Sequence, residues 1–506
     1  MTEGSFSVAM TEKVAAAARR HLLRADGQED LCFALWRPSR GATRSSALIH
    51  ELLLPRQGER NVHGNVSFDP AFLERALTTA AALGSGLALM HSHPGGRGWQ
   101  GMSRDDIAAE YGKAGAVFGA TAKPFVGLTL AGDETWSARF WERTAPRTYE
   151  RRWCRTVRVV GDRFDIHYMD ELAPRPRVTN QQIRTVSAWG DDSQADLARL
   201  RVAVVGAGSV GGIIADILAR TGFQHIDFID FDIIEDRNLD RLIYATRDDI
   251  GMLKTHVLAA HLKSRATAEH FVANPIDAAV FEEHGFRAAL DADLIFSCVD
   301  RPWGRHVLNL IAYAHLIPVI DGGIAARTNR HGKIAAADWR AHTATVGRPC
   351  LSCLGQYDPA FVQLEREGFL DDQKYIDALP KDHPLKAREN VYAFAMSCAS
   401  FQVLQALAYT LAPQGLSNPG PQLYHFVGSF MEQPDLHRCK EGCSFPSLVA
   451  TGDLCAFSVT GPRPANMMIT VAKSAISERK KGLLGFVLQC GEEIRRRLPF
   501  ARKELR

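Results

Sequence analysis

The sequence lacks the features that mark several large classes of protein. Its 60 lysine and arginine residues nearly balance 57 acidic residues, so the net charge of +3 gives no argument for nucleic-acid binding. The N-terminus has no apolar leader, and we find no run of the roughly 18–20 apolar residues that a membrane span needs. Ten cysteines in 506 residues are too few for a disulfide scaffold. We therefore expect a cytoplasmic protein that binds neither nucleic acid nor membranes.

The length of the chain predicts more than one domain, because single cores rarely grow beyond about 250–300 residues. Strand, helix and strand patterns predict an α/β domain over residues 1–145. Residues 146–182 are predicted to be a connector with a hairpin turning at Gly161 and Asp162. A second domain is expected over residues 183–476, followed by a basic tail at 477–506.

The second domain shows the alternation of strands and helices that is typical of a doubly wound parallel sheet. Residues 201–205 form an unbroken apolar run, as expected for a strand buried on both faces. Further strands are predicted at 225–230, 293–298 and 317–321. Residues 355–390 lack periodicity and are predicted to form a long loop, and a helix is predicted at 391–411.

The first chemical motif is His91-Ser92-His93-Pro94, at the end of a predicted strand. Two histidines at i and i+2 project from the same face of an extended chain, so they can share one metal ion. Ser103 and Asp106 follow at a predicted helix start. Two histidines, one carboxylate and a water would complete a four-coordinate catalytic zinc site.

This pattern resembles the JAMM/MPN metallopeptidases, which remove ubiquitin or ubiquitin-like proteins, over about residues 12–145. The resemblance implies that His91, His93 and Asp106 are zinc ligands and that Ser103 helps to hold the oxyanion. The family's general base is a glutamate on an early strand, for which Glu29 is favoured over Glu51.

One departure from that family lies between His93 and Asp106. The gap of 13 residues is about two longer than the family pattern, and the loop at 94–102 is expected to absorb the difference. If it does not, Asp105 is the alternative ligand, or the metal site is degenerate.

The second motif is the glycine loop Gly206-x-Gly208-x-x-Gly211, between a buried strand and a helix. Such a loop lets the backbone approach a phosphate at the helix N-terminus. The downstream residues are not those of an NAD-dependent oxidoreductase, because they provide charges suited to a triphosphate and Mg²⁺. These residues are Asp230, Asp232, Asn238, Arg241, Lys254 and Asp300.

This stretch resembles the ThiF/MoeB/ubiquitin-activating superfamily over about residues 177–450. The resemblance implies a Rossmann-like adenylation domain that binds ATP and Mg²⁺. It assigns the ribose to Asp230, the phosphates to Arg241 and Lys254, the lining of the phosphate pocket to Asn238 and Mg²⁺ to Asp300. The reaction would be adenylation of the C-terminal glycine of a ubiquitin-like protein.

The resemblance also implies a homodimer, in which an arginine reaches the partner subunit's ATP. That position is Gln181 here, so the arginine is absent or is supplied by Arg177 or Arg184.

Two cysteine pairs, Cys350 with Cys353 and Cys439 with Cys443, have spacings that zinc tolerates. The superfamily resemblance implies a structural four-cysteine zinc site. A thioester-forming enzyme also needs a nucleophilic cysteine, usually in the crossover region of the fold. Residues 354–397 of that region contain no cysteine, so Cys398 is the nearest candidate and Cys455 a weaker one. Cys398 lies in an apolar helical stretch, where a buried structural role is the alternative.

Together these motifs predict a bifunctional enzyme that trims or deconjugates a ubiquitin-like protein and adenylates its C-terminal glycine. Its partners would be that protein and a conjugating enzyme, as in a bacterial conjugation or defence pathway. One alternative is activation of a sulfur-carrier protein for thiocarboxylate formation, which the missing crossover cysteine favours. Another is a non-catalytic, nucleotide-binding scaffold.

Overall fold

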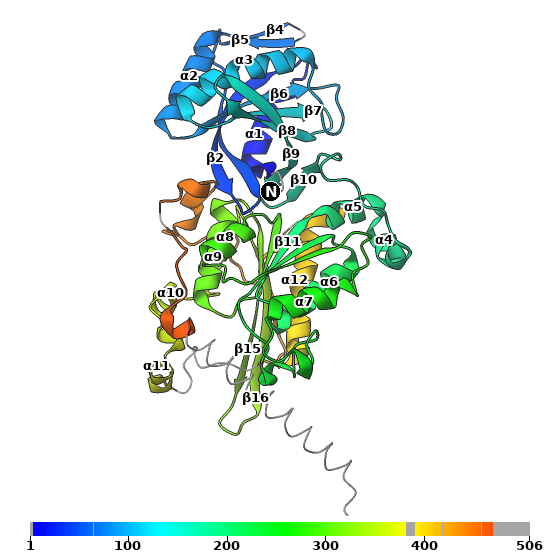
Figure 1. Cartoon of the computed structure of the whole chain (residues 1–506), viewed down its shortest axis with the longest axis vertical. Helices are drawn as coiled ribbons and strands as arrows, with labels where there is room; N and C mark the ends of the chain where they lie inside the picture. The colour runs from blue at the N-terminus through cyan, green and yellow to red at the C-terminus, as the bar shows by residue number, and fades with distance from the viewer. Residues whose placement is uncertain (1–3, 64, 381–389, 417, 457, 469–506) are drawn as a thin grey trace, which may run out of the picture.

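The computed structural model of the chain describes residues 4–63, 65–380, 390–416, 418–456 and 458–468. It contains two large sheets, one in each half of the chain, joined end to end (Figure 1). The predicted tail at 477–506 lies outside the described residues. Both halves are mixed α/β structures, as the sequence predicts.

The first sheet closes into a barrel of seven strands in the order β1-β3-β2-β6-β7-β8-β9, with β9 pairing back onto β1. An eighth strand, β10, extends from β9 outside the ring. The strands are β1 (Ser5–Thr11), β2 (Leu31–Arg40), β3 (Arg44–Leu53), β6 (Gly86–His93), β7 (Phe125–Ala131), β8 (Trp136–Ala145), β9 (Thr148–Val160) and β10 (Phe164–Tyr168). A small ribbon of β4 (Arg60–His63) and β5 (Asn65–Phe68) lies beside it.

The barrel extends beyond the predicted limit at residue 145. The hairpin expected in the connector is present, but its first strand, β9, closes the barrel instead of linking two domains. Closure pairs the edges of β1 and β9, which would otherwise be open to association with other strands.

Helices cover the barrel strands on both faces. Helix α1 (Glu12–Leu22) packs Ala15, Ala18 and Leu22 into one core with the inward residues of the strands. Helices α2 (Pro70–Ala82) and α3 (Arg104–Thr121) bury the opposite face in a second core. Helix α2 begins at an Asp69 cap with proline at its first position.

The second sheet has the order β13-β12-β11-β14-β15-β16-β17-β18. The first five strands in this order, β13, β12, β11, β14 and β15, are parallel. This is the predicted doubly wound sheet with an antiparallel extension. Its strands are β11 (Arg201–Val205), β12 (His225–Ile229), β13 (Val272–Ile276), β14 (Leu294–Ser297), β15 (Val319–Thr328), β16 (Ile334–Ala344), β17 (Gln422–His425) and β18 (Phe430–Glu432). The described helices are α4 (Ile183–Trp189), α5 (Asp191–Arg199), α6 (Ser209–Thr221), α7 (Lys254–Lys263), α8 (Glu283–Ala289), α9 (Pro302–Ala314), α10 (Pro359–Arg366), α11 (Gln373–Ala378) and α12 (Tyr392–Leu411).

The segment predicted as a long loop at 355–390 is partly helical. It contains α10 and α11, with residues 381–389 outside the described part. Both helices are short and begin at aspartate caps, Asp358 and Asp372. Helices of this length leave too few turns to establish a periodicity that the sequence alone would reveal.

The predicted helix at 391–411 is α12. Contrary to the expectation that no stretch would qualify, its length and composition alone would allow it to cross a membrane. Half of that window is buried within the protein, however, and α12 packs against α6, β15 and β16. These contacts are those of a core helix.

The two halves meet through a buried ionic network at the amino ends of β11 and β14. Arg44 of the barrel donates from Nη1 to Asp293 Oδ1 at 2.6 Å and from Nη2 to the Leu290 carbonyl at 2.7 Å. Arg158 of β9 lies 3.9 Å from the same carboxylate, and both arginines are almost completely buried. Burial acts to raise the pKa of Asp293, but Arg44 and Arg158 outweigh it and hold that pKa below its usual value.

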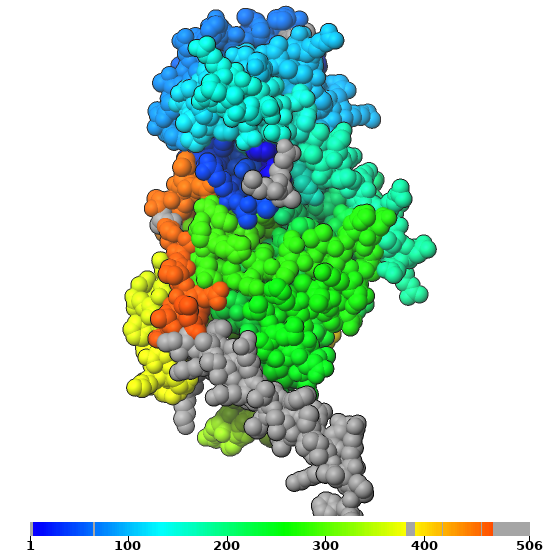
Figure 2. Space-filling view, viewed as in Figure 1, coloured from blue at the N-terminus to red at the C-terminus, as the bar shows by residue number. Residues whose placement is uncertain are grey.

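A C-terminal strap, residues 452–456 and 458–468, runs from the barrel down the side of the second half (orange in Figure 2). Asp453 accepts hydrogen bonds from Arg40 N at 3.1 Å and from Arg287 Nη1 at 2.9 Å, which ties the strap to both halves. Further along, the carbonyl of Val459 accepts a hydrogen bond from Trp303 Nε1 at 2.8 Å. The strap therefore fixes the junction from outside.

We predict that Asp293→Ala destabilises the protein by about 3–5 kcal/mol, because it leaves two buried arginines without their counter-ion. The measurement is the urea midpoint of unfolding. Asp192→Ala, which removes an exposed partner of Arg175, is the matched control and should leave the midpoint unchanged. Equal midpoints for the two variants would contradict the role given to this network.

Candidate active sites

The barrel brings His91, His93 and Asp106 together at the end of β6 and the start of α3. Their ligand atoms all lie within 4.8 Å of one another. His91 Nε2 is 3.3 Å from His93 Nε2 and 3.5 Å from Asp106 Oδ1. His93 Nε2 is 3.6 Å from Asp106 Oδ2. Two imidazoles and a carboxylate converging in this way are a donor set that zinc accepts.

A buried network behind His91 sets its charge state. Burial, and then the positive charge of Arg139, lowers the pKa of His91 to about 3, so its ring is neutral as a metal ligand must be. Arg139 donates to Thr129 Oγ1 at 2.6 Å and to Glu110 Oε2 at 3.0 Å, and Thr129 Oγ1 lies 3.4 Å from His91 Nε2. Sequence reasoning missed this network because its members are spread over three elements.

Asp106 is held by the helix that it starts. Ser103 and Asp106 form a reciprocal cap, with Ser103 N donating to Asp106 Oδ2 at 2.8 Å and Asp106 N to Ser103 Oγ at 3.1 Å. Burial acts to raise the pKa of Asp106, but His93, His91 and Ser103 together hold it below the usual value. The alternative ligand, Asp105, is exposed and is not a member of the cluster.

Glu29 lies beside this cluster, two residues before β2. Ser92, between the two histidines, holds the residue after it: Ser92 Oγ accepts from Asp30 N at 3.0 Å and donates to the Leu22 carbonyl at 2.7 Å. Burial is the main cause that raises the pKa of Glu29, with His93 and Asp106 close enough to act on it.

Glu51, the competing glutamate, lies elsewhere on the barrel. It pairs with Leu35 of β2, whereas His91 pairs with Leu31, four residues or about 13 Å along the same strand. Glu29 is therefore the glutamate that the fold brings to the cluster.

The second half contains a pocket of about 1500 Å³ at the carboxyl ends of β11, β12 and β14. This is the switch point of the sheet, where β11 and β14 are neighbours and the chain order reverses. Of the predicted residues, Gly211 does not line the pocket. The eight that do are Gly206, Gly208, Asp230, Asp232, Asn238, Arg241, Lys254 and Asp300.

The three glycines have different physical roles. Gly206 has a positive φ of 96°, and a Cβ there would lie 2.6 Å from the carbonyl oxygen of Cys298. A Cβ on Gly211 would lie 1.9 Å from the Gly206 oxygen, so the lack of a side chain at Gly211 permits the close approach of helix and strand. At Gly208, the N-cap of α6, a Cβ would meet nothing within 4 Å, which leaves open space where a ligand can approach the helix N-terminus.

The charged groups in the pocket are held by one another. Asp230 accepts hydrogen bonds from Ala207 N at 2.6 Å and Asp232 N at 2.8 Å, and burial, then Asp232, raises its pKa. Lys254 Nζ lies 2.8 Å from Asp232 Oδ2. Burial acts to lower the pKa of Lys254, but the aspartates raise it overall, so the ammonium is charged.

Several lining residues were not predicted from the sequence. Arg301 and Arg305 follow Asp300 at the start of α9, and Arg301 pairs with Asp371 at 2.8 Å. Their place next to the predicted Asp300, at a helix N-terminus, could have indicated them. Arg177, Gln181 and Arg184 are exposed and do not line the pocket of this chain.

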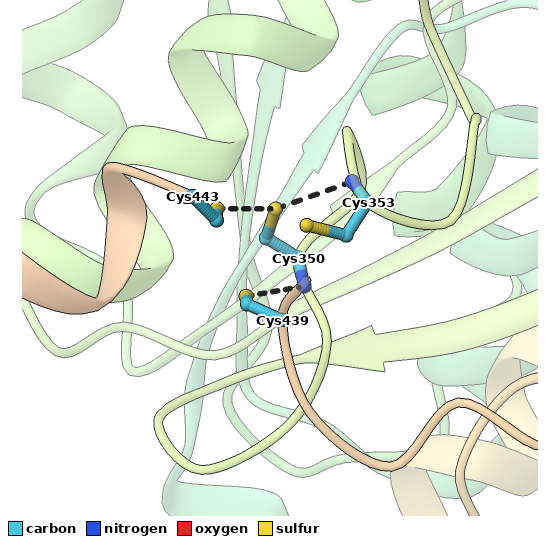
Figure 3. A group of neighbouring side chains, drawn as sticks. All are labelled: Cys350, Cys353, Cys439 and Cys443. Carbon is cyan, nitrogen blue, oxygen red and sulfur yellow. Dashed lines mark hydrogen bonds between the residues drawn. The ribbon is translucent and has the colours of Figure 1, made fainter. Parts of the chain in front are cut away.

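Cys350 and Cys353 precede α10 in the sequence, whereas Cys439 and Cys443 follow α12. The fold brings all four side chains together (Figure 3). Their sulfurs lie within 4.8 Å of one another, with Cys350 Sγ 3.7 Å from Cys443 Sγ. Backbone N–H groups of Cys350, Cys353 and Lys440 each donate to a cysteine sulfur, at 3.3–3.4 Å. Donors aimed at sulfur favour thiolates, which are zinc ligands.

Cys398 is completely buried on α12, against Trp339 and Phe394. Burial raises the pKa of its thiol to about 12, so it is not a thiolate near neutral pH. This placement favours the packing role. Cys455 is partly exposed, on the strap.

Curated relatives match parts of the second half. The adenylyltransferase and sulfurtransferase UBA4 of Meyerozyma guilliermondii is 27% identical over 35% of this chain and 39% of its own length. The SAMP-activating enzyme E1 of Haloferax volcanii is 28% identical over 33% of this chain and 57% of its own. The molybdopterin-synthase adenylyltransferase of Escherichia coli is 26% identical over 37% of this chain and 72% of its own. The chain thus spans about two fifths to three fifths of the first two relatives.

Among solved structures, Escherichia coli MccB aligns with 53% of this chain and 75% of its own, at 18% identity and a TM-score of 0.42. A model of the ThiF family matches residues 179–444, which include the eight predicted residues that line the large pocket and the four cysteines. Because that match spans more than half of the 506 residues, this chain belongs to the ThiF family.

Proposed function

We propose that the second half adenylates the C-terminal glycine of a ubiquitin-like or sulfur-carrier protein with ATP. The observation that carries this proposal is the single pocket in which the glycine loop, Asp230, Arg241, Lys254 and Asp300 meet. The similarity to two adenylyltransferases and one activating enzyme supports it.

The charges in the pocket suit this reaction. Arg241 and Lys254 would hold phosphates, Asp230 the ribose hydroxyls, and Asp300 a Mg²⁺ ion that would neutralise the triphosphate. The open space at Gly208 would admit a phosphate to the α6 N-terminus. The glycine carboxylate would attack the α-phosphorus, forming an acyl–phosphate bond as the bond to pyrophosphate breaks.

We expect ATP–pyrophosphate exchange that depends on a ubiquitin-like partner ending in glycine. Asp300→Ala should reduce its rate by about 100-fold or more, because removal of a charge-stabilising group typically has an effect of that size. Asp236→Ala is the matched control, since Asp236 lies near the pocket but does not line it. Exchange that is equal in both variants would refute the assignment.

A second candidate is sulfur transfer rather than conjugation. The burial of Cys398 favours it, because a thioester needs an accessible thiolate and residues 354–397 contain no cysteine. Hydrosulfide released by another enzyme would then attack the carbonyl carbon of the adenylate, forming a thiocarboxylate as the bond to AMP breaks. A Cys398→Ala variant that retains transfer to a conjugating enzyme would leave Cys455 as the thiol to test.

We further propose that the barrel half is a zinc peptidase for the same ubiquitin-like protein. His91, His93 and Asp106 would hold zinc, whose Lewis acidity activates water. Glu29 would take the proton of that water, and Ser103 would donate to the oxyanion. The support is the convergence of these residues together with the position of Glu29.

Glu29→Gln should lower the rate of release of a peptide fused to the partner's C-terminal glycine by about 100-fold or more, since it removes the general base. Its zinc content should remain that of the wild type. Glu51→Gln is the control and should cleave normally. Loss of activity in Glu51→Gln, with Glu29→Gln unaffected, would reverse the choice between the two glutamates.

We expect two zinc ions per chain, measured by atomic absorption after dialysis. His91→Ala should lose one and Cys350→Ser the other, because each removes a ligand from a separate site. A wild-type protein without zinc would favour the scaffold alternative.

The barrel that holds the metal cluster and the nucleotide pocket lie beyond opposite ends of the central strands of the second sheet. The barrel docks at the amino ends of β11 and β14, and the nucleotide pocket opens at their carboxyl ends. A trimmed C-terminus would therefore leave one site before it entered the other.

A further inference from the structure

The C-terminal strap continues past the junction and reaches the large pocket of the second half. Asn466 and Met467 of the strap line that pocket. Both residues lie beyond residue 444, where the match to the ThiF family ends. Part of the pocket wall is therefore built by a segment outside the family match.

The order of the strands indicates where each part of a bound nucleotide would lie. The glycine loop, which suits a phosphate, follows β11, and Asp230, assigned to the ribose, follows β12. In the sheet, β12 lies between β11 and β13. A nucleotide that runs from phosphate to ribose in this direction would place its base beyond β12, at the carboxyl end of β13.

The pocket wall at that end of β13 is apolar. Residues 278–281, with the sequence Ala-Ala-Val-Phe, follow the strand, and all four line the pocket. Phe231, directly after Asp230, lines it as well. Apolar and aromatic side chains can cover the face of a base, since every base presents a π-face. This end of the pocket therefore suits a nucleobase.

The strap is packed into this apolar wall. Gly461 N donates to the Phe281 carbonyl at 2.8 Å, and Trp303 Nε1 donates to the Val459 carbonyl at 2.8 Å. The rings of Phe281 and Trp303 stack on each other with their centroids 3.8 Å apart. Met467, which is 1% exposed, belongs to the same buried apolar cluster as these two rings.

Arg463 of the strap joins the loops that follow β12 and β13. Its guanidinium lies 4.5 Å from the centroid of the Phe231 ring. Its Nε donates to Glu282 Oε2 at 2.9 Å, and the same oxygen accepts from Ala279 N at 2.7 Å. One side chain of the strap thus holds both segments of the apolar wall.

We propose that the strap completes the base-binding end of the nucleotide pocket, with Met467 in contact with the base and Arg463 positioning Phe231. The proposal rests on the adenylation function proposed above and adds to it a binding segment outside the family match. The other end of the strap is held at the junction by Asp453. The base is therefore bound by a segment that is anchored at the barrel.

The test compares two neighbouring methionines. Met467→Ala removes a buried side chain of the pocket wall, whereas Met468→Ala changes a side chain that is 59% exposed and is not part of the lining. Calorimetric titration of the full chain with ATP, AMP and tripolyphosphate, each with Mg²⁺, separates base contacts from phosphate contacts. Met467→Ala should bind ATP and AMP about tenfold more weakly and bind tripolyphosphate as the wild type does. Met468→Ala should match the wild type with all three.

Arg463→Gln is the second variant, because it leaves the buried cluster intact and removes only the contacts with Phe231 and the 277–282 loop. It should weaken ATP and AMP binding about threefold, the effect of a partly exposed cation–π pair. Its urea midpoint should stay close to that of the wild type even if Met467→Ala lowers the midpoint. Unchanged ATP affinity in both variants would overturn the proposal. Equal losses for ATP and tripolyphosphate would also overturn it, because the strap would then support the whole pocket and not its base-binding end.

Pyrophosphate exchange separates this proposal from the adenylation proposal. With an active partner protein, Met467→Ala should raise the KM for ATP about tenfold and leave kcat unchanged, since it removes only a binding contact. Weaker binding of ATP and AMP by Met467→Ala, in a protein that shows no exchange, would keep the strap and reject adenylation. Exchange with the same KM for ATP in Met467→Ala and the wild type would keep adenylation and reject the strap.

Discussion

The buried carboxylate of Asp293 is the constraint on which the arrangement of the two halves depends. It receives Arg44 from β3 and Arg158 from β9, and its second oxygen accepts the backbone N–H of Arg201 at 3.1 Å. Buried charges of this kind are costly when unpaired, so the barrel and the second sheet each need the other. A fusion built on such a network behaves as one body rather than as two tethered domains.

This constraint determines where chemistry can occur. The network occupies the amino ends of β11 and β14, which leaves their carboxyl ends open for the nucleotide pocket. The same docking brings Arg199, at the end of α5, and the segment after β10 to the barrel wall.

Local motifs could be predicted from the sequence because each depends on neighbouring residues. His91 and His93 share one face of a strand, and the glycine loop needs only the strand and helix around it. Closure of the barrel could not be predicted. β9 contains Arg151, Arg152, Arg155 and Arg158, a composition that is typical of an exposed connector. The acid that neutralises buried Arg158 is Asp293, which lies far along the chain, so the sequence around β9 does not indicate its burial.

The most direct test of the whole account follows one ubiquitin-like partner through both halves by mass spectrometry. The partner is supplied with ATP either ending in glycine or extended beyond it. Wild-type protein should adenylate both forms, whereas His91→Ala should adenylate only the form that already ends in glycine. Adenylation of the extended form by His91→Ala, or of neither form by the wild type, would contradict the account.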